Sequence, residues 1–403
     1  MNTSTLFASR TTNDSPSRSG LQIAIMAVAA FAIVTTEYLI LGLLPALARD
    51  LRVSVAVAGQ LVTLFAFTVM LFGPLLTARL AHVGRKGLFV AILLVFCASN
   101  ALAALAPNIW VLALARFIPA LMLPVFWGTA SETAGQLAGP GNAGRAVATV
   151  YLGISAALVF GIPLGTLAAD ALGWRNTFWI LSALALLMAV LMQACMPALP
   201  QPAAAHGAQQ SAMLRDPRFL AHVGLSVLVF TAMFTAYTYL ADFLGRVAGI
   251  PSAHVGWWLM GFGLVGMAGN WIGGRVVDAN PLGATIGFLA LLAAAMVAAL
   301  LLPARHGWLA LAVAAWGLAY TALFPICQVR VMKAGSKAQA LAASMNISAA
   351  NAGTGLGAIF GGLGIEHVGL GALGYLAAGI AVLGIVVAWL MRRAATLASS
   401  PAH

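Results

Sequence analysis

Long apolar runs alternate with short polar or glycine- and proline-containing breaks along almost the whole chain. Most runs reach about 18 residues or more, which at a rise of about 1.5 Å per residue is enough to cross a bilayer. Only helices and closed barrels satisfy backbone polar groups in lipid, and runs of this length are too long for barrel strands. The pattern therefore predicts an all-α membrane protein with twelve transmembrane helices, at residues 21–48, 55–78, 87–106, 109–136, 146–170, 176–196, 219–244, 255–277, 283–303, 307–329, 341–365 and 369–391.

The longest internal break, residues 197–218, divides these helices into six and six. Its proline, alanine and glutamine content predicts a cytoplasmic linker. The linker would join an N-terminal half (21–196) to a C-terminal half (219–391), with cytoplasmic tails at 1–20 and 392–403. The tetrapeptide Ile-Ser-Ala-Ala occurs in the fifth helix and again in the eleventh, which favours an internal duplication.

Composition excludes a soluble protein, because 62% of the 403 residues are hydrophobic and only 7% are charged. Soluble domains carry about 25% charged residues. The net charge of +11 does not indicate a nucleic-acid partner, because the basic residues are dispersed between the apolar runs and form no basic face.

The basic residues instead predict the orientation in the membrane. If the N-terminus is cytoplasmic, fourteen basic residues lie on the cytoplasmic side of the membrane and five on the outer side. An excess of Lys and Arg is typical of cytoplasmic loops. Both termini are therefore expected in the cytoplasm. The cytoplasmic set is Arg10, Arg18, Arg79, Arg85, Lys86, Arg145, Arg215, Arg218, Arg275, Arg330, Lys333, Lys337, Arg392 and Arg393.

No motif for nucleotide, metal or hydrolytic chemistry appears, so neither an enzyme nor a cofactor is expected. Gly261, Gly263 and Gly266 match a dinucleotide fingerprint, but they lie inside an apolar run with no preceding strand. Helix packing is the better interpretation of this motif.

Two charges fall inside apolar runs, Glu37 in the first helix and Arg116 in the fourth. Glu37 would lie about 15 Å and Arg116 about 10 Å from the outer face, so the two share a depth. An acid balanced by an arginine could exchange a proton for a substrate. The alternative is a permanent ion pair that holds the two helices together.

Basic turns follow the second and the eighth helices and are candidates for a gate. The first turn contains Arg85 and Lys86, and Glu132 near the end of the fourth helix is a candidate partner for either one. The second contains Asp278. Ordinary topology charge explains these basic residues equally well.

The fifth helix contains Gly161, Pro163 and Gly165, a combination that favours close packing and a kink. Aromatic and amide side chains in other helices are candidates for lining a cavity. The amides are favoured because buried amides need partners. These candidates are Phe126, Trp127, Tyr237, Asn346 and Asn351.

Together these features resemble the major facilitator superfamily. The segments Thr35-Thr36-Glu37-Tyr38, Gly161-Ile162-Pro163-Leu164-Gly165-Thr166 and Gly173-Trp174-Arg175-Asn176, with Arg116, are similar to its drug:proton antiporter branch, near bacterial sugar efflux permeases and purine ribonucleoside exporters. The resemblance implies proton and substrate coupling by Glu37 and Arg116, a gating loop with Gly84, Arg85 and Lys86, and an antiporter motif at Gly161, Pro163 and Gly165. Ala81 departs from the branch, which usually has aspartate there.

The sequence thus predicts a monomeric transporter of the bacterial inner membrane that exports drugs, sugars or nucleosides against protons. Its expected partners are a small-molecule substrate, protons and the lipid bilayer. Proton-linked uptake or facilitated diffusion is the alternative, and a membrane receptor without transport is a third.

Overall fold

The computed structural model describes residues 16–53, 55–80, 82–139, 141–196, 207–301, 303 and 305–399. Every regular element in this part of the chain is helical. The first half contains α1 (Pro16–Asp50), α2 (Val55–Leu80), α3 (Arg85–Ala104), α4 (Ile109–Ala138), α5 (Ala143–Ala156), η1 (Ala157–Gly161), α6 (Ile162–Leu172) and α7 (Trp174–Cys195). The second contains α8 (Gly207–Arg215), α9 (Pro217–Tyr237), α10 (Leu240–Asp242), η2 (Phe243–Val247), α11 (Ser252–Val276), α12 (Pro281–Leu301), α13 (His306–Ala334), η3 (Ser336–Ala338), α14 (Gln339–Val368), η4 (Leu370–Ala372) and α15 (Leu373–Ser399).

Each predicted span coincides with one of these helices or with a consecutive group of them. The predicted fifth span is α5, η1 and α6 in succession, and the seventh is α9, α10 and η2. The ends differ more: α1 begins at Pro16 inside the predicted tail, and the short α8 lies within the predicted linker. Helix α13 continues to Ala334, because nothing breaks it before Gly335.

Ten of the described helical segments are individually long and apolar enough to cross a membrane. Helices α11 and α14 do not belong to that set, although both are 25 residues or longer. Both are rich in glycine, and α14 also carries Asn346 and Asn351, which lowers their hydropathy. They nevertheless pack inside the bundle, α11 against α13 and α14 against α9. The fold therefore has ten to twelve membrane-spanning helices.

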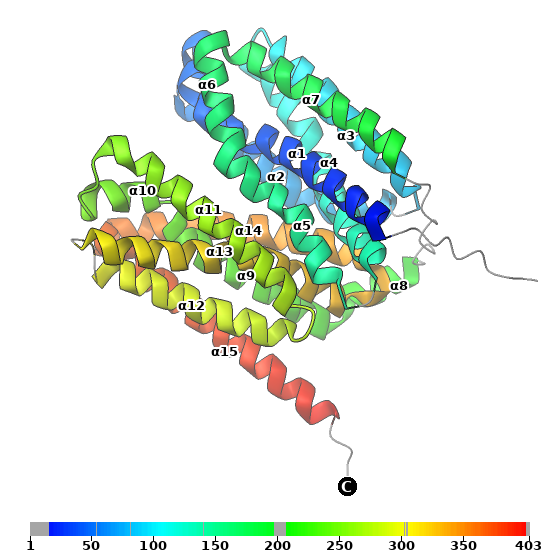
Figure 1. The fold of residues 1–403 in the computed structure, drawn as a ribbon, viewed down its shortest axis with the longest axis vertical. Coiled ribbons are helices and arrows are strands. Elements are labelled where there is room, and N and C mark those ends of the chain that lie inside the picture. Colours follow the sequence, from blue (N-terminus) through cyan, green and yellow to red (C-terminus); the bar gives the residue numbers. More distant parts are fainter. Residues whose placement is uncertain are drawn as a thin grey trace, which may run out of the picture.

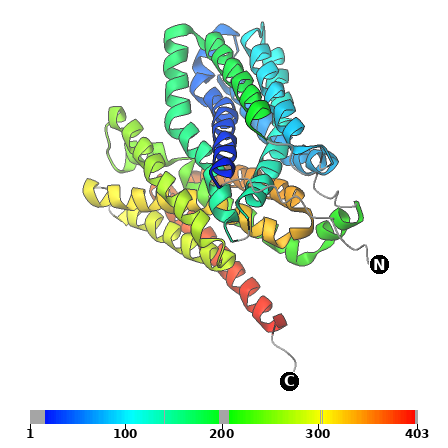
Figure 2. The same ribbon diagram turned by 45° about the vertical axis from the view of Figure 1, so that its right-hand side comes forward.

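The helices form two bundles that meet at one end of the molecule (Figure 1). One large core lies chiefly among the helices of the first half and another among those of the second. The ribbons approach one another near α5 and α8 and diverge toward α6 and α10, and the turned view agrees (Figure 2). The end at which α8 lies is called the linker end below, and the opposite end the α10 end.

Close contacts between the halves occur at the linker end. The Thr77 hydroxyl donates to that of Ser344 (2.9 Å), and the Gln328 amide donates to the Ser131 hydroxyl (3.0 Å). The Asn270 amide donates to the carbonyl of Ala148 (2.6 Å). All these residues lie near the linker ends of their helices, so the two halves are closed against one another there.

The π-helical turn η1 has a local chemical cause. Pro163 has no N–H, so it cannot donate to the carbonyl of Val159 four residues earlier. The chain widens into a π-helix over Ala157–Gly161 at this position and then resumes as α6. The irregularity expected from the proline is therefore present, whereas α4 and α13 continue as α-helices through Pro119, Pro124 and Pro325.

Two of the three glycines that match the dinucleotide fingerprint, Gly263 and Gly266, allow close helix packing. A Cβ atom added at Gly263 would lie 2.6 Å from Val159 of η1, and one at Gly266 would lie 2.6 Å from Thr321 of α13. Such distances are too short for a side chain, so α11 approaches both neighbours only because these positions lack one. Gly261 has no neighbour within 4 Å.

Candidate functional site

Arg116 of α4 reaches α1 beside Glu37. Its guanidinium donates to the backbone carbonyls of Thr36 (2.6 Å) and Glu37 (2.8 Å), and it lies 4.5 Å from the ring centre of Phe65. Arg116 is 2% exposed, whereas Glu37 is half-buried. The arginine therefore fastens α1, α2 and α4 together through backbone and ring contacts.

The Glu37 carboxylate has no hydrogen-bond or ion-pair partner among the described residues. The two residues lie close together, but Arg116 binds the backbone carbonyl of Glu37 and not its carboxylate. A permanent ion pair between the side chains, the alternative considered above, is not formed in this conformation. The acid is therefore not committed to a structural contact.

Helix α3 adds a polar contact to this region. The Asn100 amide donates to the Thr36 hydroxyl (3.2 Å) and to the carbonyl of Phe96 (2.9 Å), and the Thr36 hydroxyl donates to the carbonyl of Ala32 (3.0 Å). Sequence reasoning did not single out Asn100. Its only sequence signal was an amide inside an apolar run, shared with several residues that lie elsewhere.

The glycines of the predicted antiporter motif pack on α1 on both sides of Glu37 along the helix. A Cβ at Gly161 would collide with Oγ1 of Thr35, and one at Gly165 would lie 2.5 Å from Leu39. The backbone of Pro163 lies between them in α6, and its side chain is outside the described residues. The segment η1–α6 therefore rests directly on the turns of α1 that carry the acid.

Gly161→Ala is expected to force η1 away from α1 and to lower transport at least about tenfold, because a misplacement of about 1 Å can cost two orders of magnitude. Transport by the purified protein in liposomes measures the effect. Gly224→Ala is the matched control, since Gly224 has no neighbour within 4 Å.

Adding Thr35→Ala to Gly161→Ala should restore part of the activity, because the nearest remaining atom of residue 35 would be its Cβ at 3.1 Å. Wild-type transport by Gly161→Ala alone would contradict a role for this close contact.

A cavity of about 310 Å³ lies between the halves on the other side of η1. The first half contributes Ser155, Leu158 and Val159, and the second contributes residues of α9, α11 and α13. The latter residues are Tyr237, Gly256, Leu259, Met260, Phe262, Gly263, Tyr320 and Thr321. The turn η1 thus packs on α1 through Gly161 and lines this cavity through Leu158 and Val159.

Of the five predicted lining residues, only Tyr237 lines this cavity. Phe126 and Trp127 are buried in the first-half core, where Phe126 packs edge-on against Phe89 and Trp127 against Tyr151. Asn346 is bound to Ser226 and Gln328, and Asn351 donates to the carbonyl of Ile347 in its own helix. The four other residues were not distinguishable from lining residues, because the sequence shows which side chains lie in spans but not whether they face a cavity or the core. Phe262 and Ser155 line the cavity and were not singled out.

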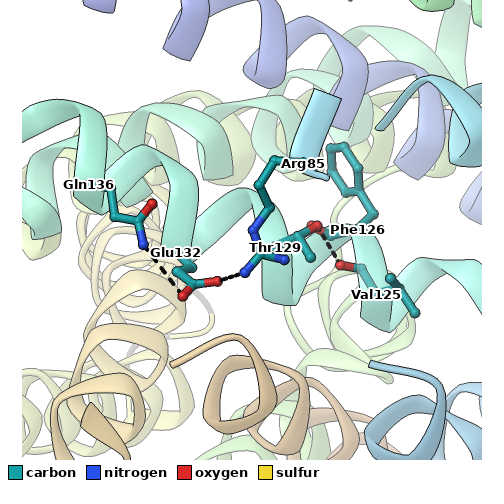
Figure 3. Close-up of polar contacts among 6 residues, drawn as sticks. All are labelled: Arg85, Val125, Phe126, Thr129, Glu132 and Gln136. Atoms are coloured by element: carbon teal, nitrogen blue, oxygen red, sulfur yellow. Dashed lines mark hydrogen bonds and ion pairs between the residues drawn. The ribbon is translucent and has the colours of Figure 1, made fainter. Parts of the chain in front are cut away.

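The first gating turn is held by a buried ion pair between Arg85 and Glu132 (Figure 3). Gln136 also donates to Glu132, across 3.5 Å. Of the two candidate partners for Glu132, the structure thus selects Arg85, whereas Lys86 makes no ion pair among the described residues. Gly84 precedes α3 at its N-cap. Ala81 lies outside the described residues.

The second turn contacts the first half directly. Asp278 accepts hydrogen bonds from the backbone N–H of Gly144 through both carboxylate oxygens, at 3.0 and 2.9 Å. Gly144 is the second residue of α5, so the carboxylate lies at the positive end of that helix. Lys333 lies 3.7 Å from the same carboxylate. Asp278 therefore forms a latch between the halves at the linker end.

Asp278→Asn is expected to weaken this latch by about 1 kcal/mol, which shifts the ratio of open to closed linker ends about fivefold. Spin labels on cysteines introduced at His82 and Lys337 would report the distance between the halves, in a background with Cys195→Ser. Asp242→Asn, at an exposed position near the α10 end, is the control. An unchanged distance distribution would show that Asp278 does not hold this end closed.

Arg330 requires a correction. It was counted among the cytoplasmic loop charges, but α13 extends past it and it is 1% exposed. Its guanidinium donates to the hydroxyls of Thr285 (3.0 Å) and Ser226 (2.7 Å) and to the carbonyl of His222 (3.2 Å). The predicted span ends at residue 329, about one turn before the end of α13 at Ala334, so Arg330 was assigned to a loop although it lies in the core.

Comparison with known proteins agrees with this architecture. A family model described as Major Facilitator Superfamily matches residues 26–346. The chain therefore belongs to the major facilitator superfamily and is a membrane transporter of small molecules, not an enzyme.

Two relatives and one solved structure illustrate the similarity. The inner membrane transport protein YdhP of Escherichia coli (strain K12) is 34% identical over 363 residues, which cover 89% of this chain and 93% of that protein. A probable sugar efflux transporter of Helicobacter pylori (strain G27) is 29% identical over 91% of this chain and 93% of that protein. The crystal structure of the human organic anion transporter MFSD10 (TETRAN) has the same fold, with a TM-score of 0.72 at 18% identity over 93% of this chain and 100% of that one.

Proposed function

We propose that this transporter exports small organic molecules in exchange for protons, as a monomer of the drug:proton antiporter branch in the bacterial inner membrane. The observation that carries the proposal is the state of Glu37. It is half-buried inside a membrane span, and its carboxylate makes no hydrogen bond and no ion pair with the described residues, although the Arg116 guanidinium is near enough to attract it. A charged side chain inside the membrane has a high free-energy cost, so an acid at such a position is most simply explained by a role in proton transfer.

The neighbouring residues support coupling between this acid and the substrate. Glu37 lies in α1 between Thr35 and Leu39, the two residues on which Gly161 and Gly165 pack. Leu158 and Val159 of the same η1–α6 segment line the cavity between the halves. A change in the charge of Glu37 therefore acts on a helix that is in direct contact with a wall of the cavity.

Alternating access supplies the remaining step. With the N- and C-termini and the linker in the cytoplasm, the linker end is the inner gate. The structure then corresponds to a state closed on the inside by Asp278, Thr77 and Gln328. Export requires these contacts to break so that substrate enters from the cytoplasm, and a proton taken up from outside would drive the return.

The relatives support this direction of transport and this location. One is named a probable sugar efflux transporter and another an inner membrane transport protein. The division into halves at 21–196 and 219–391 joined by the linker is part of the same proposal, because the two bundles would move against one another about the cavity.

Transport by purified protein in liposomes tests the proposal. A proton gradient that is acidic on the side corresponding to the cell exterior should drive substrate toward that side. The transport rate should be at least about tenfold higher than the rate of substrate exchange without a gradient. The uncoupler-treated vesicle is the control. Substrate movement that ignores the imposed pH gradient would contradict proton coupling while leaving facilitated transport as the function.

A further inference from the structure

The second-half wall of the cavity is aromatic. Tyr237 of α9, Phe262 of α11 and Tyr320 of α13 all line it and pack against one another, with ring centres 4.6 Å apart for the tyrosine pair and 5.3 and 5.5 Å from Phe262 to Tyr237 and Tyr320. Phe234, Trp316 and Phe324 pack behind them. Because three helices contribute, the rings form a rigid wall and not a flexible set of side chains.

Three hydroxyl groups face this cavity without a protein partner. Those of Tyr237, Tyr320 and Ser155 take part in no hydrogen bond among the described residues, although Tyr320 and Ser155 are buried and Tyr237 is half-buried. The hydroxyl of Thr321 differs, because it donates to the carbonyls of Gly266 and Gly317. The cavity thus combines an apolar, aromatic wall with a few free hydroxyls, a composition typical of small-molecule sites.

The second-half amide groups that could bind a free sugar are engaged in hydrogen bonds within the protein. Four amides in the spans of the second half donate to protein oxygens and are absent from the cavity lining. They are Asn270, Gln328, Asn346 and Asn351. A polyhydroxylated ring buried without partners would lose its hydrogen bonds to water, at a cost that three hydroxyls cannot offset.

We infer that this cavity selects substrates by an aromatic ring, which packs on Tyr237, Phe262 and Tyr320, with the free hydroxyls binding polar groups at its edge. The inference rests on the proposed function, since it names the substrate class for the same transporter. It also separates this chain from transport of unsubstituted sugars.

A matched pair of ligands tests the inference. Phenyl β-glucoside and methyl β-glucoside share one sugar and differ only in the aromatic group. Binding to the detergent-purified protein, measured by equilibrium dialysis at constant pH, should be at least about tenfold tighter for the phenyl compound. Equal binding of the two, or no binding of the phenyl compound at millimolar concentration, would overturn the inference.

Substitutions locate the effect. Tyr320→Leu and Tyr237→Leu should each weaken binding of phenyl β-glucoside about three- to tenfold. Tyr320→Phe keeps the ring and loses one hydroxyl, so it should weaken binding less than Tyr320→Leu does. Tyr375→Leu, at an exposed position of α15, is the control for loss of a tyrosine. If Tyr320→Leu does not fold, Tyr237→Leu decides, because Tyr237 is only half-buried. Wild-type affinity in Tyr237→Leu would overturn the inference.

These measurements use no gradient, so they are independent of coupling. Failure of the gradient experiment with preserved ring selectivity would refute proton antiport alone. The converse result would refute the aromatic site alone.

Discussion

Replacing Glu37 with glutamine is expected to abolish transport driven by a pH gradient, by at least about a hundredfold, while the protein remains folded. Glutamine cannot take up or release a proton, so the variant loses any step that depends on titration. The fold should persist because Arg116 binds the carbonyls of Thr36 and Glu37, which the substitution leaves in place. Substrate exchange without a gradient should continue in the same liposomes.

The matched control is Glu366→Gln, because Glu366 is exposed near the end of α14. It should leave both gradient-driven transport and exchange unchanged. Gradient-driven transport by Glu37→Gln at the wild-type rate would remove this residue from the coupling mechanism.

The largest effect on stability is expected from Glu132→Ala. This variant leaves Arg85, whose side chain is 2% exposed, as a buried charge without its counterion. Breaking a buried ion pair by removing one partner costs about 3–5 kcal/mol. The fraction of detergent-solubilised protein that stays monodisperse after heating should therefore fall at a markedly lower temperature than in the wild type.

Two further variants identify the cause. Replacing both Arg85 and Glu132 with methionine should recover most of the loss, because the unpaired charge is then removed as well. Asp50→Ala breaks the half-exposed ion pair with Arg175 and the hydrogen bond from the Trp174 indole, and should cost about 1–2 kcal/mol. Equal losses in Glu132→Ala and Asp50→Ala would show that burial of the Arg85–Glu132 pair contributes little.

The sequence was sufficient for the overall architecture, since the membrane requires long apolar helices and glycine or polar residues at their breaks. It also located Glu37 and Arg116, because charges inside apolar runs are conspicuous. The distance arithmetic placed them at one depth, but the contact between Arg116 and the Glu37 carbonyl depends on helix packing, which the sequence does not show.

The contents of the cavity could not be predicted in the same way. Nearly every position in these spans is apolar, so the sequence shows no periodicity that distinguishes a cavity face from a core face. Phe126 and Tyr320 are both aromatic residues in spans, yet one is in the first-half core and the other lines the cavity. Arg330 was misplaced because the charges of Arg330 and Lys333 indicated the end of the span, although α13 continues through both of them to Ala334.

The titratable acid and the aromatic cavity wall lie in different halves of the chain, which has an evolutionary consequence. The titratable acid lies in α1, whereas the rings that face the cavity come from α9, α11 and α13. Under the proposed mechanism, mutations that exchange one aromatic side chain for another can diversify what is carried without altering the residue that captures the energy of the proton gradient. New cargo specificities can therefore arise in one half of the gene while the energy-converting half is preserved.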